Sequence, residues 1–531
     1  MRYLLPLFLS GLITACGGGS GHSSAKPPPV PVVTLGPTLT MNPENATPLA
    51  GELTIETDLP TTLLLRVSGQ QEDSDSWNIK FSGHRTSHSV PILGLKSNSS
   101  YTLELVLESE GGQAAEGVEG IAITTAPLPT DFPNIDVLVN KPDFMEPGYT
   151  MIGQTGHGWD GGVAQRYGII LDATGEVVWY SPELFSGIVN RLPNGNIVFQ
   201  SDDEIREVDL LGRVIERSIL PDELYNTLHH DLHLTDSETY LSLSWESIEV
   251  NDYPASDSDP DIPPLPAVIR DEPVVEIAKD GSVLNTWTFA TMLDTNRIAF
   301  DSLRESPQGL DWIHSNAVIS SPSDDSIIVS LRHQDAVVKF YRSGQIGWIL
   351  GTHANWKAEY SPYLLTPQGS NFSWQYHQHA VTVTDTNTLL LFDNGNHRAS
   401  PFDGTTPAPR SESVSRAVEY AINEDTMEVE QVWAYGESEN IFSDIWGDAD
   451  RLPSTGNTLI AFGGTVYENG VSSADSGFGA RHARIIEVTP DTPSQKVLDL
   501  RLYNTNQELT LGTYRSQRIP ALYPDDAVVS Y

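Results

Sequence analysis

The chain has 531 residues, of which 39% are hydrophobic and 8% aromatic, enough for a sizeable core divided over two or more domains. Its 30 basic and 71 acidic residues give a formal net charge of −41 at pH 7. Such a surface repels nucleic acid and anionic lipid headgroups, which excludes nucleic acid as a partner.

Residues 1–15 have the features of a secretory signal peptide. One basic residue, Arg2, precedes the apolar run YLLPLFLSGLITA, which is too short to span a bilayer. The run leads into ITAC, which resembles the lipobox of bacterial lipoproteins, and its Cys16 is the only cysteine in the chain. We therefore expect lipidation at Cys16 and no internal disulfide in the mature protein. The alternative is an ordinary signal peptide with an incidental cysteine, which would leave a soluble periplasmic protein.

Residues 16–33 are predicted to form a tether. The segment is rich first in glycine and serine and then in proline, so a flexible stretch is followed by a stiffer one. Gly17, rather than aspartate, follows the cysteine, and by resemblance to sorted lipoproteins this residue favours the outer membrane. We expect a lipid-anchored protein on the periplasmic side of the cell envelope.

Residues 34–128 are predicted to form a small β-sandwich of the immunoglobulin or fibronectin kind. Segments such as GELTIETD, TTLLLRVSG and YTLELVLES alternate apolar and polar residues between turn clusters. Several short alternating strands in a segment of this length are typical of one sandwich. We expect this domain to be a spacer or docking module without chemistry.

Residues 129–531 are predicted to form a β-propeller. One recurring hairpin has a polar turn and then a hydrophobic run, as in LDATGEVVWY, and another has a Pro, Asn or Asp turn before a very apolar strand, as in RLPNGNIVFQ. Five copies of the second kind, with GYTMIGQTG completing a sixth, indicate repeated four-stranded units. The predicted fold class is therefore all-β, with a six-bladed propeller after the sandwich. The Asp- and Pro-rich stretch 251–273 is predicted to be a long surface loop.

Histidines precede three of the predicted inner strands, in LHHDLHLT, DWIHSNAVIS and WQYHQHAVTVT. Blades are radial, so the starts of their inner strands converge at one mouth of the central channel. Aligning the hairpin turns TDSET and TDTNT places His230 opposite His379, and the same step comes near His314. Arg332 ends the strand that returns from the His314 hairpin toward the same region. Three imidazoles and a guanidinium are therefore expected to line one pocket.

Two kinds of site suit this set of side chains. Three histidines are a common ligand set for a catalytic zinc ion. A guanidinium close to a dication would be repelled by it, however, so Arg332 favours an anionic substrate over a metal. The residues by themselves favour an anion-binding site and leave a metal site as the alternative.

The strings that carry these residues also resemble a known family. LHHDL, EIAKDGSVLNTW, DWIHSNAV, SLRHQDAVVKF, WQYHQHAV and LLFDNGNHR fall in the order seen in bacterial arylsulfate sulfotransferases, and the resemblance runs from about Phe132 to the C-terminus. It implies a leading sandwich domain and a propeller enzyme that moves a sulfuryl group between phenols without a nucleotide donor. It implies no cofactor and no metal, and it allows a homodimer.

The resemblance further implies roles for single residues. The histidine of the Gln-His motif, which is His379 here, is transiently sulfated, whereas His314 and Arg332 hold the sulfuryl oxygens. This chain departs from some enteric members in lacking a pair of cysteines, because it has none beyond Cys16.

Other site residues are implied less uniquely. The His-His-Asp motif supplies a further histidine, which is His230 or, as the alternative, His229. Asn316 helps to position the transferred group. His377, two residues before His379, is an extra imidazole that complicates the choice of nucleophile.

The implied mechanism is ping-pong. Neutral His379 attacks the sulfur of a phenyl sulfate and releases the phenol, and a second phenol then attacks the sulfohistidine. A neighbour, His230 or His314, protonates the leaving phenolate and later deprotonates the acceptor. The expected partners are a phenolic sulfate donor and a phenol acceptor. A metal-dependent hydrolase and a non-catalytic propeller that binds an anion or a glycan remain the alternative functions.

Overall fold

The computed structural model describes residues 28–530 except 70–75, 116–117, 119, 156–166, 183–188, 469–470, 473–479, 505–510 and 525–526. The predicted signal peptide, Cys16 and most of the predicted tether lie outside the described residues. The described chain consists of β-strands with short 3-10 helices between them, which confirms the all-β class. Within this part of the chain, no helix is long and apolar enough to cross a membrane.

The N-terminal domain is a hydrogen-bonded sheet in the order β37-β3-β2-β4-β5, with β1 also paired to β2. Its strands are β1 (Val33–Met41), β2 (Gly51–Gly69), β3 (Trp77–Ile92), β4 (Ser100–Ser109), β5 (Ile121–Thr124) and β37 (Ala527–Ser530). Along β2 the predicted alternation holds, since Leu53, Ile55 and Leu65 are buried and the residues between them are more exposed. The first half of β2 pairs with β1 and the second half with β4, so this long strand connects both parts of the domain through its hydrogen bonds.

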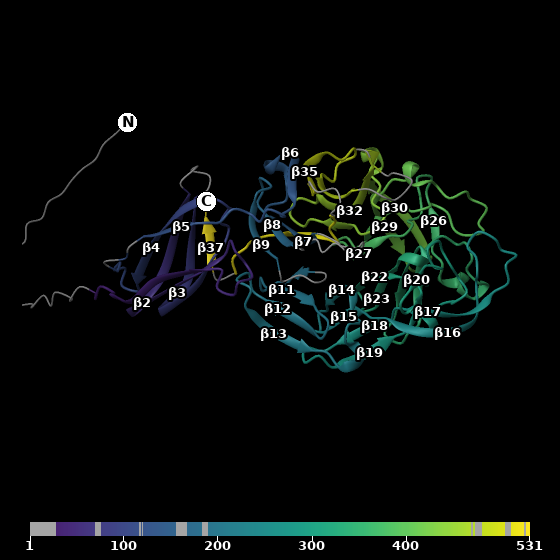
Figure 1. Cartoon of the computed structure of the whole chain (residues 1–531), viewed down its shortest axis with the longest axis horizontal. Coiled ribbons are helices and arrows are strands. Elements are labelled where there is room, and N and C mark those ends of the chain that lie inside the picture. The colour runs from purple at the N-terminus through teal and green to yellow at the C-terminus, as the bar shows by residue number, and fades with distance from the viewer. Residues whose placement is uncertain are drawn as a thin grey trace, which may run out of the picture.

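The last strand of the chain returns to this domain. β37 pairs with β3 along residues 527–530, and Val529 packs against the core of the N-terminal domain. Figure 1 shows the C-terminus among the N-terminal strands. The sequence places all of residues 129–531 in the second domain, and the structure differs from this at β37. β37 pairs there because the edge of β3 has unpaired backbone N–H and C=O groups.

Six further sheets, counted over the described residues, make up most of the second domain. Three of them are β10 (Val189–Arg191), β11 (Ile197–Gln200), β12 (Glu204–Val208) and β13 (Val214–Ile219); β14 (His229–Leu234), β15 (Tyr240–Leu243), β18 (Val274–Ile277) and β19 (Val283–Trp287); and β22 (Ser315–Ser320), β23 (Ile327–Leu331), β24 (Ala336–Phe340) and β25 (Ile346–Gly351). The next is β27 (His379–Val383), β28 (Leu389–Asp393), β29 (Arg416–Asn423) and β30 (Glu428–Tyr435), with β26 (Thr366–Gln368) at its edge. The last two are β31 (Asp448–Arg451), β32 (Thr458–Glu468), β34 (Ala480–Val488), β35 (Lys496–Tyr503) and β6 (Asn134–Asn140), with β33 (Val471–Ser472) beside β32; and β36 (Ser516–Ile519), β7 (Tyr149–Thr155), β8 (Tyr167–Leu171) and β9 (Val177–Ser181).

These sheets follow one another around a common centre (Figure 1). β14 contacts β11 and β22, β27 contacts β22 and β31, and β32 contacts β36. The backbone N–H of Arg191 in β10 donates to Oε1 of Gln517 in β36 at 3.1 Å, which joins the first sheet to the last. Strands from the two ends of the domain also interleave, because β6 pairs with β35 and β36 pairs with β7. The predicted number of blades stays a prediction.

The long loop that composition predicts for 251–273 spans only residues 254–264, and strands take up most of the rest. β16 (Glu246–Tyr253) pairs with β17 (Leu265–Asp271), and β21 (Gly309–Leu310) and β20 (Glu305–Ser306) extend the same small sheet. β17 forms because Ile269 is fully buried in an apolar cluster that also contains Trp312, which outweighs the prolines around it. This strand carries Arg270, which contributes to the site.

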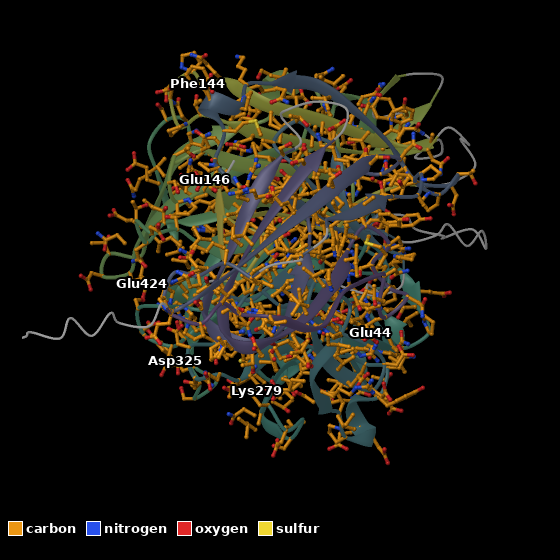
Figure 2. All side chains as sticks on the ribbon, turned by 90° about the vertical axis from the view of Figure 1, so that its left-hand side faces the viewer. Glu44, Phe144, Glu146, Lys279, Asp325 and Glu424 are labelled. Atoms are coloured by element: carbon orange, nitrogen blue, oxygen red, sulfur yellow. The ribbon has the colours of Figure 1, made fainter. Side chains whose placement is uncertain are left out.

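The two domains share part of their core. The apolar cluster that contains Leu65 of the N-terminal sheet also contains Trp179 of β9 and Phe199 of β11. The hydroxyl of Tyr523 donates to the carbonyl oxygen of Leu93 at 2.9 Å across the same boundary. In Figure 2 the N-terminal sheet faces the viewer in front of the other sheets. The domain therefore packs directly against the second domain.

Candidate active site

The inner strands that carry the predicted histidines all begin irregularly. The pairing register shifts at the first residues of β14, β22 and β27. His230, His314 and His377 have φ angles of 59°, 47° and 53°, in the left-handed region that non-glycine residues rarely adopt. Backbone strain of this kind gathers at functional sites, where the surroundings hold it in place. The ring of His230 lies 5.0 Å from the ring of His314, so two of the predicted histidines meet.

His379 begins β27, and only 2% of it is exposed. Its Nδ1 lies 2.7 Å from Oδ1 of Asn394. The amide nitrogen of Asn394 donates to the carbonyl oxygens of Ser443 and Trp446, at 2.7 and 2.8 Å, so Oδ1 is the atom that faces the ring. His379 must then carry its proton on Nδ1 and a lone pair on Nε2. Among the described residues, Nε2 has no hydrogen-bond partner.

The position of Asn394 depends on the glycine that follows it. Gly395 has a φ of 75°, and a Cβ added there would lie 2.4 Å from the carbonyl oxygen of Val414. Only glycine allows the chain to turn at this point. Asn394 thus directly follows β28, whose end lies opposite the start of β27, and it is within reach of His379.

The environment keeps His379 neutral. Burial, followed by the positive charge of Arg332, lowers the pKa of His379 to about 3. Because the folded-state pKa is lowered, the neutral form is complete near neutral pH and is lost only as the pH falls through this value.

His229 and His230 form a pair at the start of β14. Nε2 of His229 donates to the carbonyl oxygen of Ser244 at 3.0 Å, so its Nδ1 accepts from Nδ1 of His230, 2.5 Å away. Burial lowers the pKa of His229 to about 4, with Arg270 acting in the same direction, and burial also lowers the pKa of His230. His230 presents Nε2 as a lone pair, whereas both ring nitrogens of His229 are engaged. Of the two sequence candidates, the geometry therefore favours His230.

His314 is held by a carboxylate. Its Nδ1 donates to Oδ2 of Asp311 at 2.8 Å, so its lone pair also lies on Nε2. Arg270 donates to Oδ1 of Asp311 at 2.6 Å and lies 2.7 Å from Oε1 of Glu272. Burial, and then the charge of Arg332, lowers the pKa of His314. The imidazolium form of this ring therefore gives up its proton readily.

Arg332 returns toward His314, as its place in the hairpin predicts. Its backbone N–H donates to the carbonyl oxygen of His314 at 3.1 Å. Its side chain is buried, donating to Nε2 of His333 and, at 3.3 Å, to the carbonyl oxygen of Asp444. One carboxylate oxygen of Asp301 lies 3.9 Å away. The guanidinium is thus oriented mainly by neutral acceptors and keeps most of its charge for a ligand.

Tyr514 and Arg515 complete the site from the C-terminal end of the second domain. The Tyr514 ring lies 5.8 Å from that of His230 and 6.1 Å from that of His379. Burial raises the pKa of Tyr514, and its protonated hydroxyl donates to the carbonyl oxygen of Asn316 at 2.9 Å. Arg515 pairs with Asp231 at 2.9 Å. Tyr514 therefore lies between two of the predicted histidines.

Asn316 is fully buried and contacts the backbone next to the predicted nucleophile. Its amide nitrogen donates to the carbonyl oxygen of Gln378 at 2.8 Å. Gln378 directly precedes His379, so Asn316 ties β22 to the first residue of β27. The structure thus places Asn316 as a backbone anchor beside the predicted nucleophile.

The extra imidazole of His377 is locked in place. Its Nδ1 and backbone N–H both lie 2.8 Å from Oδ1 of the buried Asp335, and its Nε2 lies 3.4 Å from Oδ2 of Asp301. The pKa of His377 is raised because these two carboxylates outweigh its burial. A carboxylate faces each ring nitrogen of His377, so the geometry favours His379 over His377 as a nucleophile.

Two groups in the described part of the chain have donor atoms for a metal ion. They are Asp301, His377 and His397, and Asp311, His314 and His333, with the donor atoms of each group within 4.8 Å of one another. A guanidinium already accompanies each carboxylate, since Arg332 lies 3.9 Å from Asp301 and Arg270 lies 2.6 Å from Asp311. These positive charges oppose a cation and favour an anion in the space between them.

Sequence reasoning missed the residues that fix the histidines. Two of them left a signal, because Asp311 lies in the DWIH string and Asn394 in the LLFDNGN string. Arg270, Tyr514 and Arg515 come from distant segments and reach the site only through the fold.

Fold and site together define an all-β protein of two domains, the second of which brings several histidines together with the buried Arg332. The family model described as Arylsulfotransferase (ASST) matches residues 141–515, and the model described as the Arylsulfotransferase Ig-like domain matches residues 38–126. The chain belongs to the arylsulfotransferase family.

Two relatives of the chain share one name. Arylsulfate sulfotransferase AssT from Escherichia coli O6:H1 (strain CFT073) is 26% identical over 367 residues, which are 58% of this chain and 58% of that protein. The protein of the same name from Lelliottia amnigena is 25% identical over 333 residues, 52% of each chain. The chain thus spans little more than half the length of these relatives. A solved structure from Bacteroides caccae, of a protein of unknown function, is 13% identical with a TM-score of 0.38, covering 67% of this chain and 94% of that one, a likeness too distant to support any inference.

Proposed function

We propose that this chain transfers a sulfuryl group from a phenolic sulfate ester to an acceptor phenol through a sulfated histidine. The observation that carries the proposal is the lone pair on Nε2 of His379, fixed by Asn394 and next to the charge of Arg332. Membership of the arylsulfotransferase family and the names of its relatives support it. A neutral nucleophile beside a guanidinium suits attack on a monoanionic ester.

In the first half-reaction, Nε2 of His379 attacks the sulfur in line. The bond from sulfur to the phenolic oxygen breaks, and its electron pair leaves with the phenolate. The transition state is loose, as in phosphoryl transfer, so negative charge moves onto the leaving oxygen and onto the sulfuryl oxygens that Arg332 holds. The Nδ1 proton stays on the ring because the amide oxygen of Asn394 accepts a hydrogen bond but does not take the proton. The intermediate is therefore an N-sulfoimidazolium. Its ring leaves easily as a neutral imidazole when the sulfur–nitrogen bond breaks.

In the second half-reaction, an acceptor phenol occupies the place that the first phenol has left. Its oxygen attacks sulfur, the sulfur–nitrogen bond breaks, and the electron pair returns to Nε2 of His379. A neighbouring histidine, His230 or His314, exchanges the phenolic proton. Both half-reactions use the same residues, so ping-pong kinetics follow. The proposal needs no cofactor and no metal.

One assay tests this function directly. The protein is incubated with p-nitrophenyl sulfate and a second phenol, with chelator present and no nucleotide sulfate donor. We expect release of p-nitrophenol and formation of the sulfated second phenol. Activity that chelator abolishes would point to a metal-dependent hydrolase, and binding of the ester without turnover would point to a silent anion-binding propeller.

The lowered pKa of His379 predicts an unusual pH dependence. Its neutral form is present above the folded-state pKa of about 3, so protonation of this ring should cause no loss of rate between roughly pH 8 and pH 5. The measurement is phenol release in a single turnover without acceptor, quenched into alkali at each pH. A loss of rate centred near about 6.5, the ordinary histidine value, would contradict the proposed state of this residue.

We also propose that the six sheets close into a six-bladed propeller. The unbroken series of contacts from β11 to β36 and the hydrogen bond from Arg191 to Gln517 support closure. An experimental structure should show six four-stranded sheets around one channel. An open arc, or another number of sheets, would refute it.

The anchor is a separate proposal. The ITAC sequence after a short apolar run supports lipidation at Cys16 and retention at the periplasmic side of the outer membrane. We expect the wild-type protein in the membrane fraction and the Cys16→Ser variant neither processed nor retained in that way. Fractionation and immunoblotting provide the measurement, and wholly soluble wild-type protein would contradict the proposal.

A further inference from the structure

A chain of polar contacts reaches His314 from the small sheet that the sequence does not predict. Arg270 of β17 donates to Oδ1 of Asp311 at 2.6 Å, and Oδ2 of Asp311 accepts from Nδ1 of His314 at 2.8 Å. The Asp311 side chain is only 6% exposed. One oxygen of this carboxylate accepts from the guanidinium and the other from the ring, so the proton of His314 lies on Nδ1. The lone pair of His314 therefore lies on Nε2.

The other histidines of the site lack this support. Nδ1 of His230 faces the neutral ring of His229, and Nδ1 of His379 faces the neutral amide of Asn394. His377 has carboxylates near both ring nitrogens and so presents no free nitrogen. Among the described residues, His314 is the ring that joins an accessible lone pair to a carboxylate able to stabilise the protonated form.

Asp311 is also connected to Arg332, the proposed anion-binding residue, through His333. Its backbone carbonyl oxygen accepts from Nδ1 of His333 at 2.6 Å, and Nε2 of His333 accepts from the guanidinium of Arg332. Asp311 thus orients His314 through its carboxylate. Through its backbone carbonyl it orients His333, which in turn holds Arg332. The two groups keep a fixed relation to each other.

We propose that Asp311, held by Arg270, is the positioning residue that makes His314 the proton-transfer group of this enzyme. The proposal rests on the sulfuryl transfer proposed above. When an acceptor phenol attacks sulfur, Nε2 of His314 takes the phenolic proton while the sulfur–nitrogen bond breaks and its electrons return to His379. The imidazolium is stabilised by Asp311. The imidazolium keeps this proton until the next donor ester binds and then gives it to the departing phenolate, so protons balance over one full turnover.

The test uses donors that need the proton to different degrees. The phenolate of p-nitrophenyl sulfate leaves easily without a proton, whereas that of unsubstituted phenyl sulfate needs one. Asp311→Asn should slow phenol release from phenyl sulfate by roughly 100- to 10,000-fold. The corresponding factor for p-nitrophenyl sulfate should be smaller by about tenfold or more. A purely structural role for Asp311 predicts equal losses with both donors, and that result would overturn the proposal.

Asp325→Asn is the matched control. Asp325 lies in the turn between β22 and β23, far along the same hairpin, with 58% of its side chain exposed and at the periphery of the molecule (Figure 2). This variant should behave as wild type with both donors.

A second variant keeps the test decisive if Asp311→Asn does not fold. His314→Gln removes the proton-transfer ring and leaves Asp311 in place, and it should show the same unequal loss. Equal losses in His314→Gln would also refute the proposal. If the wild-type protein transfers sulfate from neither donor, the proposed function is refuted. That result differs from equal losses in the variants, which refute only the role of Asp311.

Discussion

Replacing His379 with alanine is expected to abolish both the covalent intermediate and turnover. Wild-type protein incubated with an aryl sulfate and no acceptor should gain about 80 Da, the mass of one SO3 group, and should lose it when a phenol is added. In His379→Ala the lone pair that attacks sulfur is gone, so no adduct forms and transfer falls to the rate without enzyme. Mass spectrometry of the intact protein and of its peptides measures the adduct and its position.

Two variants make this result specific. His84→Ala is the matched control, because His84 is exposed on β3 of the N-terminal domain, and it should keep both the adduct and turnover. His377→Ala tests the neighbouring ring, which is held between Asp335 and Asp301, and it should still form the adduct at His379. An adduct at His377 or full activity in His379→Ala would move the nucleophile to another residue.

Hairpin turns explain how the sequence located part of the site. A turn fixes the register of its two strands, so counting back from equivalent turns gives equivalent positions. His230 and His379 lie the same number of residues before the ends of β14 and β27, as the alignment predicts. The same count in β22 leads to Asn316 and not to His314. His314 still meets His230, because a left-handed residue at φ 47° redirects the chain just before β22.

The residues that the sequence did not reveal depend on long-range packing. Arg270 lies in a stretch whose prolines and aspartates predict a loop, and it reaches Asp311 because Ile269 beside it is buried in the core. Tyr514 belongs to the segment before β36, a strand that pairs with β7 near the other end of the domain. Neither arrangement has a local periodicity from which to infer it. The return of β37 to the N-terminal sheet likewise has no local signal in the sequence.

Arg332→Ala is expected to produce a large loss of activity although it leaves the nucleophile in place. The guanidinium is buried, and its charge acts on both His379 and His314, so it meets the charge that grows on the sulfuryl oxygens in both half-reactions. Loss of one such donor costs about 2.7 to 4 kcal/mol of transition-state stabilisation, a fall of roughly 100- to 1000-fold in kcat. Steady-state kinetics with p-nitrophenyl sulfate and a saturating phenol measure this effect.

The pattern of kinetic constants then separates charge from geometry. Arg332→Lys keeps a positive charge but loses the planar fork that donates to His333 and to the carbonyl of Asp444, so it should recover only part of the lost rate. Arg217→Ala, with 56% of the native side chain exposed, should match wild type. Because Arg332 acts on charge that appears only as the sulfur bonds change, its loss should lower kcat more than it raises KM. A change confined to KM would mean that Arg332 binds the ester without stabilising the transition state, and the proposed role would be wrong.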